Sequence, residues 1–262
     1  MIGALMIAIL TVSHGTSDPL GQQAIGRYAE AVHAAVDADL AHHAFVDVQQ
    51  PDVGEALRTL PADATIVIVP LLLSRGYHLG HDIPAASAPY GDRVIVAPAL
   101  GPDPRLAEIL TRRMLEAGLR PDDRIVLAAA GSSDRAGVED GLQAGALLAA
   151  ASRRPVTVGF LSAAEPTLDT AVSAASSDVP TTARVLAASY LLARGYFHRQ
   201  AERSNADVVT EPLLRTDRPP EWELVAVARE RYFAALSDSG IALSPFSAPR
   251  LRTSATSDAT RP

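Results

Sequence analysis

Two kinds of hydrophobic pattern alternate along this chain: short apolar, β-branched runs, and longer Ala-rich stretches in which apolar residues recur every three or four positions. The short runs predict buried strands and the long stretches predict helices. The predicted strands cover residues 4–12, 44–48, 65–72, 93–97, 125–129, 156–160, 184–189 and 207–210. The predicted helices cover residues 20–38, 52–59, 80–87, 103–117, 135–150, 166–176, 196–204 and 220–236. This alternation is typical of an α/β fold in which helices cover both faces of a parallel sheet.

The pattern occurs twice. Residues 45–53 (FVDVQQPDV) line up with 160–168 (FLSAAEPTL), 70–78 (PLLLSRGYH) with 189–197 (SYLLARGYF), and 14–18 (HGTSD) with 130–134 (AGSSD). The offsets are nearly equal (160 − 45 = 115, 189 − 70 = 119 and 130 − 14 = 116), which indicates a duplicated domain. We expect domains at 1–120 and 121–236, each a parallel four-stranded sheet, joined near 117–123. The Ser-, Thr- and Pro-rich segment 237–262 is predicted to be a poorly ordered tail.

Composition narrows the possible functions. The 262 residues are 48% hydrophobic and 20% charged, with a formal net charge of −7, and no basic run offers a nucleic-acid surface. The absence of cysteine excludes disulfides, thiolate nucleophiles and iron–sulfur clusters. The apolar N-terminal run is too short for a membrane span and lacks the flanks of a signal peptide, so we expect a cytoplasmic protein without a membrane partner.

Candidate chemistry gathers where predicted strands of the first half end. His14 follows the first strand, Asp47 falls at the end of the second, and His78 follows the third. Open α/β sheets bind ligands beyond the carboxyl ends of their strands, so these three side chains are expected at one rim of a cleft between the halves. Imidazole and carboxylate suit divalent first-row metals, and a neutral imidazole also accepts protons. The second half has Ala130 and Phe197 at the histidine positions, and therefore lacks this chemistry.

The segments SHGTSDP, FVDVQQPDV, VPLLLSRGYHLGHDIPA and APALGPDP together resemble the class II chelatases, the sirohydrochlorin cobalto- and ferrochelatases, in their two-domain long form. The resemblance extends over residues 6 to 215, and LLLSRGYHLGHDIP is its most specific part. It implies two flavodoxin-like lobes that bind sirohydrochlorin between them. It also implies ATP-independent insertion of a divalent metal ion, as in siroheme or cobalamin biosynthesis, with no organic cofactor.

The resemblance also implies roles for individual residues. The metal-site histidines of the family fall on His14 and His78. Its first-half Glu falls on the shorter Asp47, and its next acidic position is Gln50, whereas the second half has Glu165. We therefore expect His14, His78 and Asp47 to hold the metal, and these residues with Glu165 to move protons. Fe²⁺, Co²⁺ and Ni²⁺ accept the same ligands, so the sequence does not select the metal.

Sirohydrochlorin carries eight carboxylates, so an acidic protein needs local positive charge or backbone donors to bind it. The candidate substrate-binding residues are Gly15, Thr16, Ser17, Arg75, Tyr77, Arg194 and Tyr196. The internal duplication can take the place of a homodimer, which is compatible with a monomer. His81, His33 and the pair His42–His43 are interpreted as surface or loop residues.

Two other functions fit parts of the pattern. A histidine phosphatase also places His-Gly after a first strand, but it needs an Arg directly before the nucleophile, where this chain has Ser13. A non-catalytic metal or tetrapyrrole carrier would explain why one half of the duplicated site lacks histidines. A carrier would bind sirohydrochlorin without accelerating metal insertion.

Overall fold

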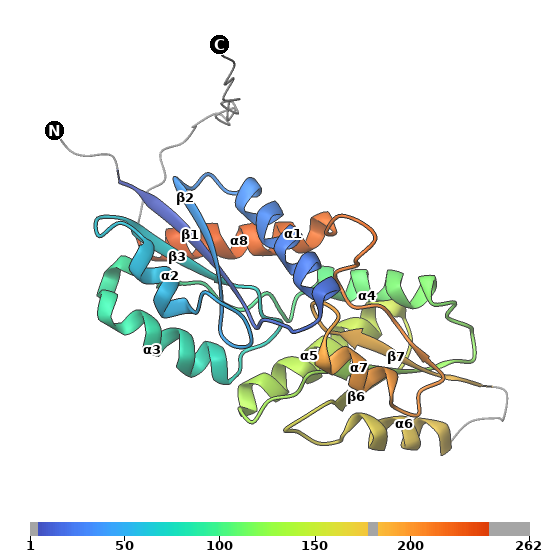
Figure 1. Cartoon of the computed structure of the whole chain (residues 1–262). Coiled ribbons are helices and arrows are strands. Elements are labelled where there is room, and N and C mark those ends of the chain that lie inside the picture. Colours follow the sequence, from blue (N-terminus) through green and yellow to red (C-terminus); the bar gives the residue numbers. More distant parts are fainter. Residues whose placement is uncertain (1–4, 178–182, 241–262) are drawn as a thin grey trace, which may run out of the picture.

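The computed structural model describes residues 5–177 and 183–240, which form two parallel four-stranded sheets (Figure 1). The strand orders, β2-β1-β3-β4 and β6-β5-β7-β8, are the same in the two repeats. The strands are β1 (Ile7–Ser13), β2 (Leu40–Phe45), β3 (Thr65–Pro70), β4 (Val94–Val96), β5 (Arg124–Ala129), β6 (Val156–Phe160), β7 (Val185–Tyr190) and β8 (Val208–Val209). The predicted architecture, two duplicated α/β domains that each contain a parallel four-stranded sheet, is confirmed.

Aspartates set where four of the helices begin. Asp18, Asp52, Asp103 and Asp134 each precede a helix, and each side chain accepts a hydrogen bond from a backbone amide of the first turn. Such caps satisfy donors that have no partner inside the helix. The helices are α1 (Pro19–Ala35), α2 (Val53–Thr59), the π-helix η1 (His78–Asp82), α3 (Ile83–Ser87), the 3₁₀-helix η2 (Ala88–Arg93), α4 (Pro104–Glu116), α5 (Arg135–Ser152), α6 (Leu168–Ser177), α7 (Tyr196–Glu202) and α8 (Trp222–Asp238).

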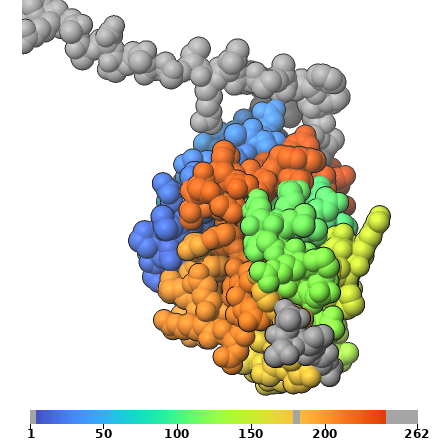
Figure 2. All heavy atoms as spheres, turned by 90° about the vertical axis from the view of Figure 1, so that its right-hand side faces the viewer, coloured from blue at the N-terminus to red at the C-terminus, as the bar shows by residue number. Residues whose placement is uncertain are grey.

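The last helix of each repeat packs on the other repeat. α8 contacts α1, β3 and β4 of the first repeat, whereas α4 contacts α5 and β7 of the second. Figure 2 shows the green surface of α4 between the red-orange α8 and the orange segments of the second repeat. The largest apolar cluster accordingly contains buried residues from both sheets, such as Ile9 and Leu127. This shared core fixes the two sheets against each other.

The second strand lies earlier than its predicted position, 44–48. β2 runs from Leu40 to Phe45 and therefore includes His42 and His43, which were expected in a loop. The strand tolerates these polar residues because Thr11 and Ser13 of β1 hydrogen-bond the His43 ring. β2 ends at Phe45, and in the turn that follows Val48 adopts a left-handed conformation (φ 63°).

The predicted tail lies almost entirely outside the described residues, although 237 and 238 belong to α8. Among the helices described here, none is long and apolar enough to cross a membrane.

Candidate active site

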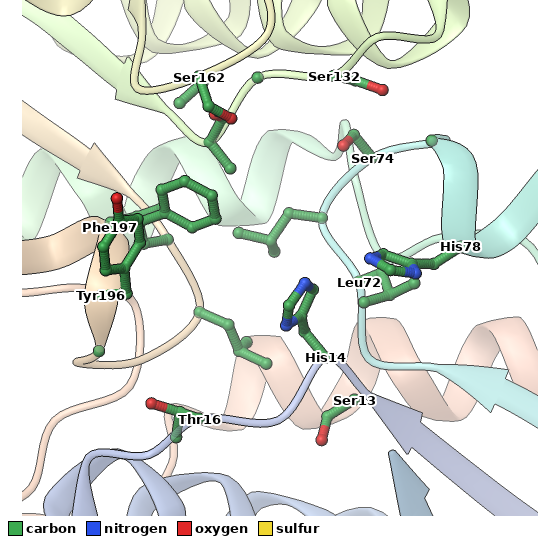
Figure 3. A pocket seen from close by; sticks show the side chains of 18 of the residues that line it. Ser13, His14, Thr16, Leu72, Ser74, His78, Ser132, Ser162, Tyr196 and Phe197 are labelled. Atoms are coloured by element: carbon green, nitrogen blue, oxygen red, sulfur yellow. The ribbon is translucent and has the colours of Figure 1, made fainter. Parts of the chain in front are cut away.

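A cavity of about 550 Å³ lies between the repeats and is lined by the loops that follow β1, β2 and β3 and by their counterparts after β5, β6 and β7. His14 and His78 lie on one side of it, and Tyr196 and Phe197 lie on the opposite side (Figure 3). The carboxyl ends of both sheets therefore open onto one cleft, as the sequence predicted from the parallel arrangement of the strands.

The two histidines meet at the mouth of this cleft. His14 is the first residue after β1, and His78 is the first residue of η1. Their ring centroids are 4.8 Å apart and the ring planes are nearly perpendicular, at 85°. Side chains 64 positions apart (78 − 14) thus converge closely enough to bind the same ion.

The pKa of His14 is lowered, mainly because burial disfavours the charged imidazolium and secondarily because His78 is close. A backbone hydrogen bond with Gly15 and the charge of Asp47 oppose this shift. The His14 ring is consequently neutral at pH 7, which leaves a nitrogen lone pair for a metal ion or a proton.

Asp82 orients His78 through a 2.6 Å hydrogen bond between His78 Nδ1 and the Asp82 carboxylate. The bond engages Nδ1 and leaves Nε2 as the nitrogen for a ligand. The two residues occupy the single turn of π-helix η1, a rare conformation that is frequent at functional sites. Sequence reasoning missed Asp82, and its i, i+4 spacing from His78 is the signal that was available.

The turn after His14 requires glycine. Gly15 has φ 91°, and a Cβ at this position would collide with the backbone carbonyl of Asp47. The Asp47 amide donates to the carbonyl of His14 at 3.0 Å, so the loops after β1 and β2 are directly connected. Gly131 in the second repeat has φ 87° and makes the equivalent approach to Ser162.

The two predicted carboxylates lie in different places. Asp47 lines the cleft and is exposed, and its Oδ1 accepts a hydrogen bond from the Val48 amide at 2.8 Å. Glu165 does not line the cleft, and its carboxylate accepts from the Thr167 amide at 2.9 Å. Within residues 5–177 and 183–240, no three His, Asp or Glu side chains converge in a geometry that would hold a metal ion. The structure thus joins the two imidazoles without gathering either carboxylate into a three-ligand set.

Both predicted anion-binding arginines are engaged in ion pairs. Arg75 is paired with Asp140 of α5 and does not line the cleft that contains the histidines. Arg194 lines that cleft and is paired with Glu211. Both positive charges are therefore balanced by a carboxylate in this conformation.

The other predicted substrate-binding residues line the cleft. They are Gly15, Thr16, Ser17, Tyr77 and Tyr196. The Thr16 amide donates to Gln49 Oε1 at 2.9 Å, and α1 begins after this segment with Asp18 as its cap. Tyr77 and Tyr196 are 56% and 63% exposed and so present accessible rings. His81 stacks against Tyr77, with ring centroids 4.7 Å apart, and is exposed.

His33, which was expected on a helix surface, and His43, which was expected in a loop, form a polar network beside the site. The buried hydroxyl of Thr11 is 2.9 Å from His33 Nε2 and 2.9 Å from His43 Nδ1, and Ser13 Oγ is 3.1 Å from His43 Nε2. This network joins β1, β2 and α1, and it includes Ser13, the residue directly before His14. Burial and the nearby His33 lower the pKa of His43 to about 4.

Two repeated α/β sheets that present paired imidazoles to a shared cleft define a protein of the chelatase-like fold class. The family model described as CbiX matches residues 8–117 and 124–210, which is more than half of the chain. The chain therefore belongs to the CbiX family.

Named relatives agree with this membership. The chain is 33% identical over 114 residues to a sirohydrochlorin cobaltochelatase of Sulfurisphaera tokodaii, a match that covers 42% of this chain and 93% of the relative. It is 30% identical over 135 residues to a sirohydrochlorin ferrochelatase of Bacillus subtilis, covering 48% of this chain and 52% of the relative. The solved structure of SirB from Bacillus subtilis with Fe³⁺ has the same fold, with a TM-score of 0.74 at 22% identity, over 90% of this chain and 98% of SirB.

Proposed function

We propose that this protein is an enzyme that inserts a divalent metal ion, Fe²⁺ or Co²⁺, into sirohydrochlorin without an organic cofactor or ATP. The observation that carries the proposal is the meeting of His14 and His78 at a cleft between the repeats. Membership in the CbiX family, whose matched relatives are named sirohydrochlorin chelatases, supports the same substrate.

The imidazole pair suits an ion that must be taken up and then released. His14 is neutral and His78 has its Nδ1 bound to Asp82, so one nitrogen of each ring is available to the metal. Two protein ligands leave the remaining coordination positions to water and to the incoming macrocycle. Such an open site exchanges its ion, whereas a closed four-ligand site is typical of structural metals.

Insertion replaces two pyrrole N–H protons with one M²⁺, so two protons must leave the macrocycle for each metal gained. A neutral imidazole is a suitable first acceptor, and His14 is in position to act as one. Asp47 is exposed at the edge of the cleft and would pass a proton to water. Glu165 lies outside the cleft lining, which favours Asp47 for this role.

The opposite wall of the cleft suits the face of the macrocycle. Tyr196 and Phe197 come from the second repeat, and Phe197 occupies the place that matches His78. Aromatic rings pack well against a flat conjugated ligand. The macrocycle would therefore lie between the aromatic wall and the imidazole pair, with its pyrrole nitrogens toward His14 and His78. Arg194 would then be within the cleft for the carboxylates.

The test follows absorbance while purified protein is mixed with sirohydrochlorin and either Fe²⁺ or Co²⁺. We expect His14→Ala and His78→Ala to lower the rate by at least about 10²-fold, the usual contribution of a general base. His42→Ala is the matched control because this histidine lies on β2 and outside the cleft lining. Equal rates in all four proteins would contradict the mechanism. Binding of sirohydrochlorin by wild type without acceleration would instead identify a carrier.

A further inference from the structure

The loop that carries His78 is held from the second repeat. The loop leaves β3 and passes through Leu73 and Arg75 before η1 begins. The buried hydroxyl of Tyr190, at the end of β7, donates to the Leu73 carbonyl at 3.0 Å. Asp140 of α5 binds the loop at Arg75, three positions before His78. The placement of His78 therefore depends on contacts that its own repeat does not supply.

Asp140 binds this loop through both oxygens of its carboxylate. Its Oδ2 accepts from the Arg75 backbone amide at 2.7 Å, and its Oδ1 accepts from Arg75 Nη2 at 2.6 Å. Arg75 Nε is 3.1 Å from both carboxylate oxygens. The Asp140 side chain is 2% exposed and the Arg75 side chain is 55% exposed, so the carboxylate is shielded from water while the guanidinium keeps one side in solvent. The bonds to the carboxylate are charge-assisted. One carboxylate thus fixes both the main chain and the side chain of Arg75.

The second repeat lacks the equivalent contact. Arg194 matches Arg75 in the repeat alignment, but its ion-pair partner is Glu211 of the same repeat. The position in α1 that matches Asp140 is Ala24 (140 − 116). Likewise, Leu71 occupies the place that matches Tyr190. The buried carboxylate contact is therefore found at the loop that carries His78, whereas α7, which carries Phe197, is tied to the first repeat by a different contact, the ion pair between Arg199 and Asp18.

We propose that Asp140 is a positioning residue that holds the loop at residues 73–78 so that the His78 ring meets His14. The inference rests on the proposed function. A loop without such an anchor samples many conformations, and each additional one separates the two imidazoles for part of the time. Outer contacts that orient a metal ligand typically change metal affinity 10- to 100-fold. Asp140 does so through the backbone, because its Oδ2 is bound to the Arg75 amide.

The experiment measures Co²⁺ binding to the protein without sirohydrochlorin, and then steady-state insertion kinetics. Asp140→Asn keeps the side-chain shape and removes the charge, and we expect the Kd for Co²⁺ to rise about 10-fold or more. We expect kcat to fall about tenfold while the KM for sirohydrochlorin changes less than about twofold, because Asp140 does not line the cleft. The Co²⁺ absorption bands should also change, because the two imidazoles would no longer share one geometry.

Asp123→Asn is the matched control. Asp123 is also buried, and it also accepts from an arginine, Arg184, and from a backbone amide, that of Arg120. It precedes β5, at the opposite end of that strand from the cleft. Asp123→Asn should lower the unfolding temperature comparably and leave the Kd for Co²⁺ at the wild-type value.

A wild-type Kd for Co²⁺ in Asp140→Asn, or equal weakening in the Asp140 and Asp123 variants, would overturn the positioning role. If Asp140→Asn does not fold, Asp140→Glu decides, since it keeps the charge but moves the carboxylate away from its place at the Arg75 amide; an unchanged Kd for Co²⁺ would then overturn the role. Wild-type protein that fails to accelerate insertion would refute the proposed function. In that case the Kd values for Co²⁺ of the Asp140 and Asp123 variants would still test the positioning role of Asp140, because this measurement does not use sirohydrochlorin.

Discussion

The half-buried ring of His43 predicts that acid destabilises this protein. His43 is bound through both nitrogens, to Thr11 and to Ser13, and its pKa is lowered to about 4 because burial disfavours the charged ring and His33 lies nearby. A backbone hydrogen bond with Thr11 opposes the shift. The folded protein therefore keeps this ring neutral at pH values where an exposed histidine is charged.

The sign and size of the effect follow from linkage. A histidine in the unfolded chain titrates near pH 6.5. Between about pH 6.5 and pH 4, His43 is therefore protonated in the unfolded chain but stays neutral in the folded protein. The free energy of unfolding consequently decreases as the pH falls through this range. The pKa difference corresponds to a loss of about 2 kcal/mol between pH 7 and pH 5, which solvent screening at a partly exposed ring reduces to about 1–2 kcal/mol.

Urea unfolding at pH 7 and pH 5 tests this reasoning on wild type, His43→Gln and His42→Gln. Glutamine cannot titrate, so His43→Gln should lose about 1–2 kcal/mol less than wild type between the two pH values. His42→Gln, altered at the neighbouring position of β2, should behave like wild type. If the free energy of unfolding of His43→Gln depends on pH as strongly as that of wild type, the lowered pKa of His43 does not cause the acid destabilisation.

Four further substitutions test three separate features of the structure. Asp82→Asn should weaken Co²⁺ binding about tenfold, measured by absorption titration, because the asparagine no longer offers the His78 ring a charged acceptor; unchanged binding would show that Asp82 does not orient the ring. Gly15→Ala and Gly131→Ala should both lower the unfolding temperature, since each Cβ would collide with a backbone carbonyl, but only Gly15→Ala should also weaken Co²⁺ binding. Tyr28→Phe removes the 2.9 Å hydrogen bond to the Leu224 carbonyl and should cost about 1 kcal/mol in urea unfolding; no loss would show that this bond between α1 and α8 adds nothing to stability.

The order of elements was accessible from the sequence because hydrophobic periodicity records which residues face a core. The repeat offsets then predicted two similar sheets, and both have the same strand order. The second strand was the exception, because His42 and His43 do not look like strand residues. Their placement depends on Thr11 and Ser13 of the adjacent strand, which a local pattern does not contain.

For the site, the sequence located the side chains but not their partners. His14, Asp47 and His78 lie at or after the carboxyl ends of predicted strands of one parallel sheet, so their common cleft followed from topology. Arg75 was expected to bind substrate, yet the structure pairs it with Asp140, 65 positions away. Asp82 is close to His78 in the sequence, but its hydrogen bond to the His78 ring became evident only from the conformation of η1.

The sequence by itself determined the two repeats, the strands and helices within them and the histidines at the strand ends, because these depend on local periodicity and on chain order. Tertiary structure decided that α4 and α8 pack on each other's repeats and that Asp140 holds the loop of His78. It also decided that His43 is neutral inside the fold. These features depend on which surfaces meet and how far each charge lies from water, and both quantities exist only once the chain is packed.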